Sequence, residues 1–99
     1  MFNLSAEITV DKKFDSYIVK KAVNMALREK FSLDRMQVGQ RVYKSEVIAL
    51  IQQIEGVVNT ELNHLYDSEK SVGLFDLSPN VNEIFRINPN EIILKVKII

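Results

Sequence analysis

The first ten residues alternate between apolar and polar side chains, and this alternation constrains the fold more than any other feature of the sequence. Successive side chains of a β-strand point to opposite faces, so the pattern predicts a half-buried strand over residues 2–10. Such a strand must bury its apolar face against other elements. The predicted inward side chains are Phe2, Leu4, Ala6, Ile8 and Val10, and the predicted outward ones are Asn3, Ser5, Glu7 and Thr9.

An amphipathic helix is predicted to follow this strand and to end near Phe31. Asp15 is a good N-cap because its carboxylate can accept hydrogen bonds from the free amides of the first turn. Phe14 and Val19 stand at the positions of a hydrophobic staple. Apolar residues then recur every three or four positions and form one stripe that should face a core: Val19, Ala22, Val23, Ala26 and Leu27.

A second amphipathic helix is predicted between Ser45 and Gly56. Ser45 is the predicted N-cap, Glu46 suits the positive end of the helix dipole, and Gly56 can adopt the left-handed conformation that stops a helix. The connection before it, residues 32–43, has neither helical nor strand period, and Gly39 is expected to take a positive φ there. The predicted buried stripe of this helix is Val47, Leu50, Ile51 and Ile54.

Further strands are predicted in the second half of the chain. Residues 58–66 alternate, with Leu62, His64 and Tyr66 on one face. A short strand is expected near residues 84–87, and "NPN" at 88–90 predicts a turn because Pro89 fixes its own backbone angle. The closing strand should direct Ile92, Leu94, Val96 and Ile98 inward and Glu91, Lys95 and Lys97 outward.

Together these elements predict one α+β domain over residues 1–99. It is expected to be a two-layer sandwich, with a mainly antiparallel sheet of three or four strands and two helices on one face, in the order β-α-α-β-(β)-β. The other face of the sheet should be solvated or lightly contacted. Its predicted side chains are Asn3, Ser5, Glu7, Asn59, Glu61, Lys95 and Lys97.

Composition argues against several classes of function. Thirteen basic and thirteen acidic residues cancel, which gives no electrostatic field for nucleic acid. No run approaches the roughly 18 to 20 apolar residues that a membrane span needs. The three glycines lack the spacing of a phosphate-binding loop. Nucleic-acid partners, membrane association and a small-molecule substrate are therefore not expected.

His64 is the only histidine, and there is no cysteine. A metal site needs at least three converging ligands, and a general base needs an orienting partner. Glu61 and Asp67 lie at odd offsets from His64 on a strand, so both are expected to face away from it. The sequence therefore predicts no catalytic residue, no metal ligand and no cofactor, and His64 is interpreted as a residue at the end of the sheet with an ordinary hydrogen bond.

Three stretches follow one family pattern: "NMALREKF", "VGQRVYKSEVIALIQQIEGVVNTELNHL" and "INPNEIILKVKI". The residues that carry it are Val23, Ala26, Leu27 and Phe31, then Gly39, Val42, Tyr43, Ser45, Glu46, Ile51, Ile54, Gly56 and Val57, and finally Ile87, Pro89, Glu91 and Ile92. On these residues the chain resembles the C-terminal region of Baseplate J-like proteins, which belong to contractile phage tails and related injection systems. The pattern covers almost the whole chain.

The resemblance implies a non-enzymatic role as a baseplate wedge component that holds neighbouring tail proteins together and takes part in the rearrangement during sheath contraction. It implies that Ser45 starts the second helix, that Gly56 ends it and that Tyr43 pins the preceding loop. The implied partners are other baseplate and tail proteins, with copies of the chain itself as a further candidate. The implied location is the cytoplasm during assembly, then the baseplate of a virion or injection system.

Proteins of this family are usually several times longer. The chain is therefore expected to be either an excised C-terminal module or a small tail protein that shares the module. Candidate contact surfaces are the polar sheet face, the connection at residues 32–43, the loop from Asp67 to Asn80 and any unpaired strand edge.

A second hypothesis belongs to another class of function. It is a regulatory domain of ferredoxin-like type that pairs its sheets into a dimer and binds a small ligand at the interface. That hypothesis predicts a glycine in the turn after the first strand, and residues 11–16 contain none. An enzyme is a more distant third hypothesis.

Overall fold

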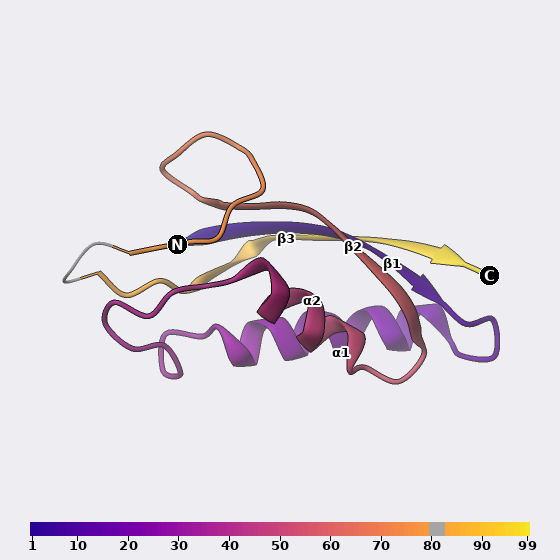
Figure 1. Ribbon diagram of the computed structural model, residues 1–99. Coiled ribbons are helices and arrows are strands. Elements are labelled where there is room, and N and C mark those ends of the chain that lie inside the picture. The colour runs from indigo at the N-terminus through magenta and orange to yellow at the C-terminus, as the bar shows by residue number, and fades with distance from the viewer. Residues whose placement is uncertain (80–82) are drawn as a thin grey trace.

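The computed structural model describes residues 1–79 and 83–99 and consists of two layers, a three-stranded sheet and a pair of helices (Figure 1). Both helices lie against the same face of the sheet, as predicted. The α+β class is therefore confirmed. The elements in chain order are β1 (Phe2–Val10), α1 (Ser16–Lys30), α2 (Lys44–Gln52), β2 (Val57–Asp67) and β3 (Ile87–Ile98).

The sheet has the strand order β2-β1-β3, so the first strand of the chain is the central one. β1 pairs antiparallel with β2 and parallel with β3. This mixture arises because β3 runs opposite to β2 but lies on the other side of β1. The predicted mainly antiparallel sheet of three or four strands is thus correct only in part, since the sheet is mixed and has three strands.

The apolar face of β1 forms the centre of the core. All five predicted inward residues of β1 are buried, and the buried residues of the helices pack beneath them. The rings of Phe31 and Phe85 meet the ring of Phe2 edge to face, with centroids 5.5 Å and 6.4 Å away. The buried helical residues are Val19, Val23 and Leu27 in α1 and Val47 and Ile51 in α2.

Helix α1 begins and ends as predicted. The Asp15 carboxylate accepts hydrogen bonds from the amides of Tyr17 and Ile18 at 2.9 and 3.4 Å. Phe31 is the C-cap residue, and its amide donates to the carbonyl of Leu27. The cap signals lie within a few residues of the groups they satisfy, so the sequence alone reveals them.

Helix α2 begins two residues earlier than predicted, and Ser45 is not its N-cap. Tyr43 is the N-cap residue, but its side chain makes no capping hydrogen bond, and the residue is 43% exposed. The amide of Lys44 instead donates to the carboxylate of Asp76 at 2.8 Å. A residue 32 positions away therefore performs the capping that was assigned to Ser45. Glu46 lies in the first turn, as predicted.

Gly56 ends a turn rather than helix α2, which already stops at Gln52. Its φ of +97° belongs to the left-handed region that glycine tolerates best. A Cβ atom at this position would lie 2.8 Å from Cγ2 of Val19 and 3.0 Å from the Phe14 ring. Gly39 also has a positive φ, +74°, as predicted.

A β-bulge in β2 changes which residues face the core. Ser5 pairs with His64 while Ala6 pairs with Leu62, so Asn63 is the extra residue. Leu62 and Leu65 are both buried as a result, and His64 is exposed. The prediction that Leu62 and His64 share a face is therefore wrong, because strict alternation does not hold across a bulge.

The "NPN" stretch lies inside β3 rather than in a turn between two strands. β3 advances five residues, from 87 to 92, while β1 advances two, from 2 to 4, so three extra residues of β3 bulge out of the ladder between Ile87 and Ile92. The Asn88 side chain accepts a hydrogen bond from the Asn90 amide at 3.2 Å within this bulge. The expected short strand near residues 84–87 is not formed, and Ile87 is instead the first residue of β3.

Candidate interaction surfaces

His64 lies on the outer face of the sheet, the face opposite the helices. The bulge at Asn63 also brings Glu61 to this face, opposite Glu7, so the prediction that Glu61 faces away from His64 is wrong. Asp67 pairs with Phe2 and is 9% exposed, on the opposite face, as predicted. Among the side-chain hydrogen bonds and ion pairs of the described residues, none involves the His64 side chain, so the hydrogen bond predicted for it is not formed.

The outer face carries polar and charged side chains in rows that run across the three strands. One row contains His64, Ser5 and Ile93, the next Glu61, Glu7 and Lys95, and the third Asn59, Thr9 and Lys97. Within the part of the chain that the structure describes, no group of three His, Asp or Glu side chains could hold a metal ion. None of the described helices is long and apolar enough to cross a membrane.

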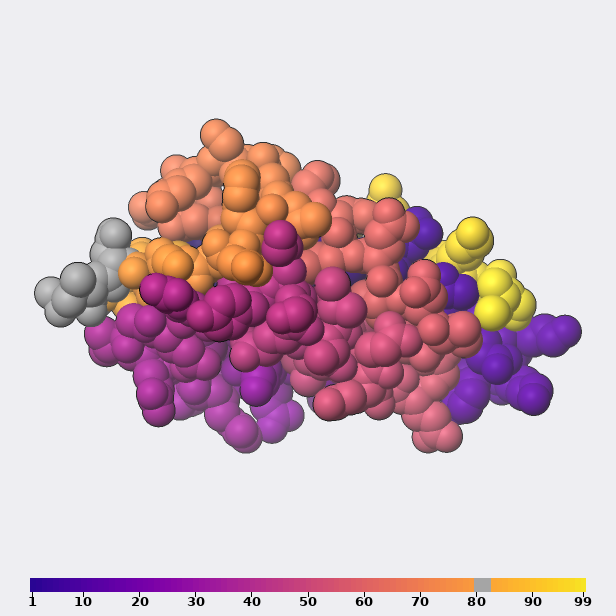
Figure 2. Space-filling view, in the orientation of Figure 1, coloured from indigo at the N-terminus to yellow at the C-terminus, as the bar shows by residue number. Residues whose placement is uncertain are grey.

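The edge formed by β2 is covered by the loop that follows it. We call residues 68–78 the strap. The Leu65 amide donates to the Gly73 carbonyl at 2.8 Å, and the Phe75 amide donates to the Leu65 carbonyl at 3.0 Å, so the strap pairs with the β2 backbone. Figure 2 looks onto this side of the molecule and shows the strap, in orange, meeting the segment before α2.

The strap is held in place at its other end by α2 and the segment that precedes it. Val42 and Leu77 form an isolated antiparallel bridge, with hydrogen bonds of 3.0 and 2.7 Å between their backbones. The Asp76 carboxylate caps α2 beside this bridge. Leu77 is 6% exposed and belongs to the core. The strap therefore links the β2 edge to the start of α2.

The opposite end of the β2 edge is covered by a side chain of α2. The Gln52 amide group donates to the Val58 carbonyl at 3.0 Å, and the Thr60 hydroxyl donates to the Gln52 side-chain oxygen at 2.7 Å. A side-chain amide thus occupies a carbonyl of the strand edge that would otherwise be open to another strand.

No described residue covers the edge formed by β3 in this way. No other described strand pairs with β3 on the side away from β1. Ile99 exchanges hydrogen bonds with Val10 and Lys12 of the β1 side, so by alternation Lys95 and Lys97 also direct their backbone groups toward β1. The backbone groups of the intervening residues point to the open side: Ile92, Leu94, Val96 and Ile98.

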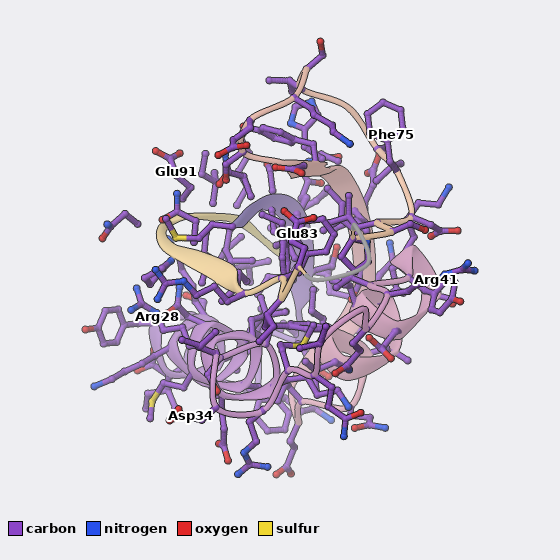
Figure 3. All side chains as sticks on the ribbon, turned by 90° about the vertical axis from the view of Figure 1, so that its left-hand side faces the viewer. Arg28, Asp34, Arg41, Phe75, Glu83 and Glu91 are labelled. Atoms are coloured by element: carbon purple, nitrogen blue, oxygen red, sulfur yellow. The ribbon has the colours of Figure 1, made fainter. Side chains whose placement is uncertain are left out.

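The open part of β3 begins where the bulge ends. The Arg28 guanidinium donates to the Pro89 carbonyl at 2.8 Å and, through Nε, to the Asn24 side chain at 2.6 Å, which ties the bulge to α1. Beyond the bulge, Ile93 is 50% exposed and Ile98 is 60% exposed. Figure 3 shows Glu91 on the side of β3 opposite the helices and Arg28 between α1 and this strand.

A hollow lies between the strap and Phe85. It has a volume of about 440 Å³ and is lined by Asp67, Lys70, Phe75 and Phe85, among others. Phe85 is buried and belongs to the core, so the hollow is lined by both apolar and charged side chains.

Two loops were also predicted as contact surfaces, the loop from Asp67 to Asn80 and the connection at residues 32–43. The loop predicted from Asp67 to Asn80 contains the strap, and Asn80 itself lies outside the described residues. The connection at residues 32–43 exposes Leu33 and Val38. Sequence reasoning missed Asp76 and Gln52, because neither lies close in sequence to the backbone groups it binds.

Comparison of the chain with protein-family models, curated proteins and solved structures finds no match.

Proposed function

We propose that this chain is a non-enzymatic assembly module of a phage-like contractile tail baseplate, and that it acts through protein–protein contacts. Its partners are other baseplate and tail proteins. Its location is the cytoplasm during assembly and the baseplate of the virion or injection system afterwards. The main contact in this proposal is the open edge of β3.

The observation that carries the proposal is that one edge of the sheet is covered and the other is open. Backbone and side-chain groups of the same chain close the β2 edge, while the open edge of β3 from Ile92 to Ile98 has no described partner. An extended segment of another protein can add to such an edge through main-chain hydrogen bonds. The resemblance of the chain to Baseplate J-like proteins supplies the kind of assembly in which this contact would be used.

A single added strand gives a weak contact, which suits a large assembly. Contacts that are weak one at a time become effective when many copies are held together, because each further binding event is intramolecular. The exposed Ile93 and Ile98 side chains next to the edge add apolar area to the contact. Lys95 and Lys97 favour acidic partner segments.

The ligand-binding hypothesis has one observation in its favour, the hollow between the strap and Phe85. A volume of this size is within the range of small-molecule sites. The element order argues against it, since a ferredoxin-like fold separates its two helices by strands, whereas α1 and α2 are consecutive here. A thermal-shift screen against metabolites distinguishes the two. A specific stabilisation of several degrees would support ligand binding, and its absence supports assembly.

The proposed function is tested by capturing tail proteins with the tagged chain from cells that produce the tail particle. Proline at position 96 removes an amide that points to the open side and leaves the ladder to β1 intact. Val96→Ala is the matched control because it removes the side chain and keeps the amide. We expect the original chain and V96A to recover sheath, tube or spike proteins and V96P to recover about tenfold less.

Two results would contradict the proposal. One is recovery of metabolic enzymes without any tail protein. The other is the absence of the tagged chain from purified tail particles. The genes that flank the coding sequence give an independent check, because neighbouring sheath, tube and spike genes would support the same conclusion.

A further inference from the structure

We propose that the open edge of β3 pairs with β3 of a second copy of this chain, antiparallel and centred on Ile93. This inference rests on the proposed function and deepens it, because it names the occupant of the same edge. The segment from Glu91 to Lys95 carries the charge pattern that favours this pairing. It has an acidic residue at one end, a basic residue at the other and three apolar residues between them.

Such a segment is complementary to itself when it is reversed. In an antiparallel pair centred on Ile93, Glu91 of each copy lies directly opposite Lys95 of the other. Opposite charges at directly opposed positions stabilise a strand pair. Glu91, Ile93 and Lys95 all belong to the outer face of the sheet, and all three are exposed. The two Ile93 side chains, each 50% exposed in the single chain, then cover one another.

Backbone hydrogen bonding favours the same register. Ile92 lies opposite Leu94 of the second copy, and both residues direct their amide and carbonyl groups to the open side. They therefore form a hydrogen-bonded pair, and the symmetric pair forms on the other side of Ile93. A shift of one residue along only one strand would place Ile92 opposite Lys95, whose backbone groups point toward β1. The hydrogen-bonded pairs could then not form.

Neighbouring registers that keep this hydrogen bonding are less favourable, because they set either two lysines or an isoleucine and a lysine opposite each other. Centring the pair on Lys95 places the two Lys95 side chains opposite each other, and centring it on Val96 places Lys95 opposite Lys97. Centring it on Leu94 sets the apolar Ile93 opposite Lys95, although Glu91 then faces Lys97. Like charges in direct opposition destabilise a strand pair, so the register centred on Ile93 is favoured.

The arrangement also fits the layer below the sheet. α1 packs beneath β3 and α2 beneath β2, so the β3 edge can approach a second copy without α2 in the way. The Arg28 contact to Pro89 keeps the bulge against α1, so the regular contact with a second copy begins at Glu91. The contact is therefore small, and we expect a dissociation constant on the order of 0.1 mM.

Sedimentation equilibrium of the purified chain between about 10 μM and about 1 mM tests this proposal. We expect E91K to weaken dimerisation about tenfold, because two attractive pairs become repulsive at once. The double variant E91K/K95E should restore it, since the charges are then exchanged but complementary. K97E is the matched control, because Lys97 lies outside the pairs of this register, and it should dimerise like the original chain.

Amide exchange gives a second readout that does not depend on any variant. The amides of Ile92 and Leu94 should exchange more slowly as the protein concentration rises, while those of Val96 and Ile98, which face the bulge of the second copy, should not. Far-UV circular dichroism checks that each variant is folded.

A chain that stays monomeric at about 1 mM would overturn this inference, as would dimerisation that E91K leaves unchanged. Rescue of E91K by K97E instead of K95E would overturn the proposed register. A monomeric chain that still captured tail proteins would reject the self-pairing and leave the proposed function supported. A chain that dimerised but was absent from tail particles would reject the proposed function and leave the self-pairing supported.

Discussion

One edge of this small sheet is covered by other parts of the same chain, and the other edge is open. At the β2 edge, the strap pairs with Leu65, and Gln52 occupies the carbonyl of Val58. At the β3 edge, the open residues from Ile92 to Ile98 meet no described strand, and the only modifications are a bulge before them and lysines along them.

The difference shows what closing an edge requires in a chain of 99 residues. The strap covers the β2 edge only because Asp76 and Leu77 attach it to α2 and the segment before it. The β3 edge relies on charge and irregular backbone, which discourage indiscriminate pairing without preventing a complementary strand from binding. A closed edge therefore contributes to stability, and an open edge contributes to association.

The largest expected effect comes from detaching the strap. Leu77→Ala removes a buried side chain, so we expect a loss of about 3 kcal/mol in the free energy of unfolding. Leu74→Ala is the matched control in the same strap, because Leu74 is 42% exposed and should lose less than about 1 kcal/mol. Urea unfolding measures both. Equal losses would show that the strap is not anchored through Leu77.

A smaller effect is expected at the cap of α2. Asp76→Ala leaves the Lys44 amide without its carboxylate partner and should cost about 1 kcal/mol. Faster exchange of the Lys44 and Phe75 amides should accompany this loss. Asp34→Ala, which changes an exposed aspartate in the preceding connection, should change stability by less than about 0.5 kcal/mol. If Ser45→Ala proved costlier than Asp76→Ala, the assignment of the cap would be wrong.

Gln52→Ala should open the other end of the β2 edge. It removes hydrogen bonds to Val58 and Thr60, and we expect a loss of about 1 kcal/mol. The neighbouring Gln53→Ala serves as the control because that side chain is exposed and lies on the same turn. Chemical denaturation compares the two, and the comparison of edges fails here if Gln53 matters as much as Gln52.

The smallest effect on stability, and the largest on solubility, is expected at the open edge. Lys97→Ile should change the free energy of unfolding by less than about 0.5 kcal/mol, because Lys97 is exposed. It should nevertheless increase concentration-dependent association, since a charge that protects the edge is replaced by a residue that favours strands. Lys20→Ile on α1 is the control, and light scattering is the measurement. Equal association of both variants would indicate general stickiness rather than an effect of the edge.

The interaction surface could be predicted only in general terms. An unpaired edge was expected, and the alternation at residues 91–98 indicated a strand with two outward lysines. Which edge stays open depends on where β3 pairs, and nothing near β3 in the sequence specifies that it joins β1 in parallel. The bulge at Asn63 was equally invisible, so the placement of His64 and Glu61 was predicted incorrectly.

The sequence by itself determined the strand at residues 2–10, the helix capped by Asp15 and the arrangement of a sheet with both helices on one face. Each of these depends on periodicity or on groups a few residues apart. Only the tertiary structure decided the mixed sheet, the capping of Lys44 by Asp76 and the closing of one edge but not the other. Asp76 and Lys44 are 32 residues apart in the chain, and their contact requires the strap to lie against β2. Local patterns report which groups need a partner, whereas the folded chain determines which partner they find.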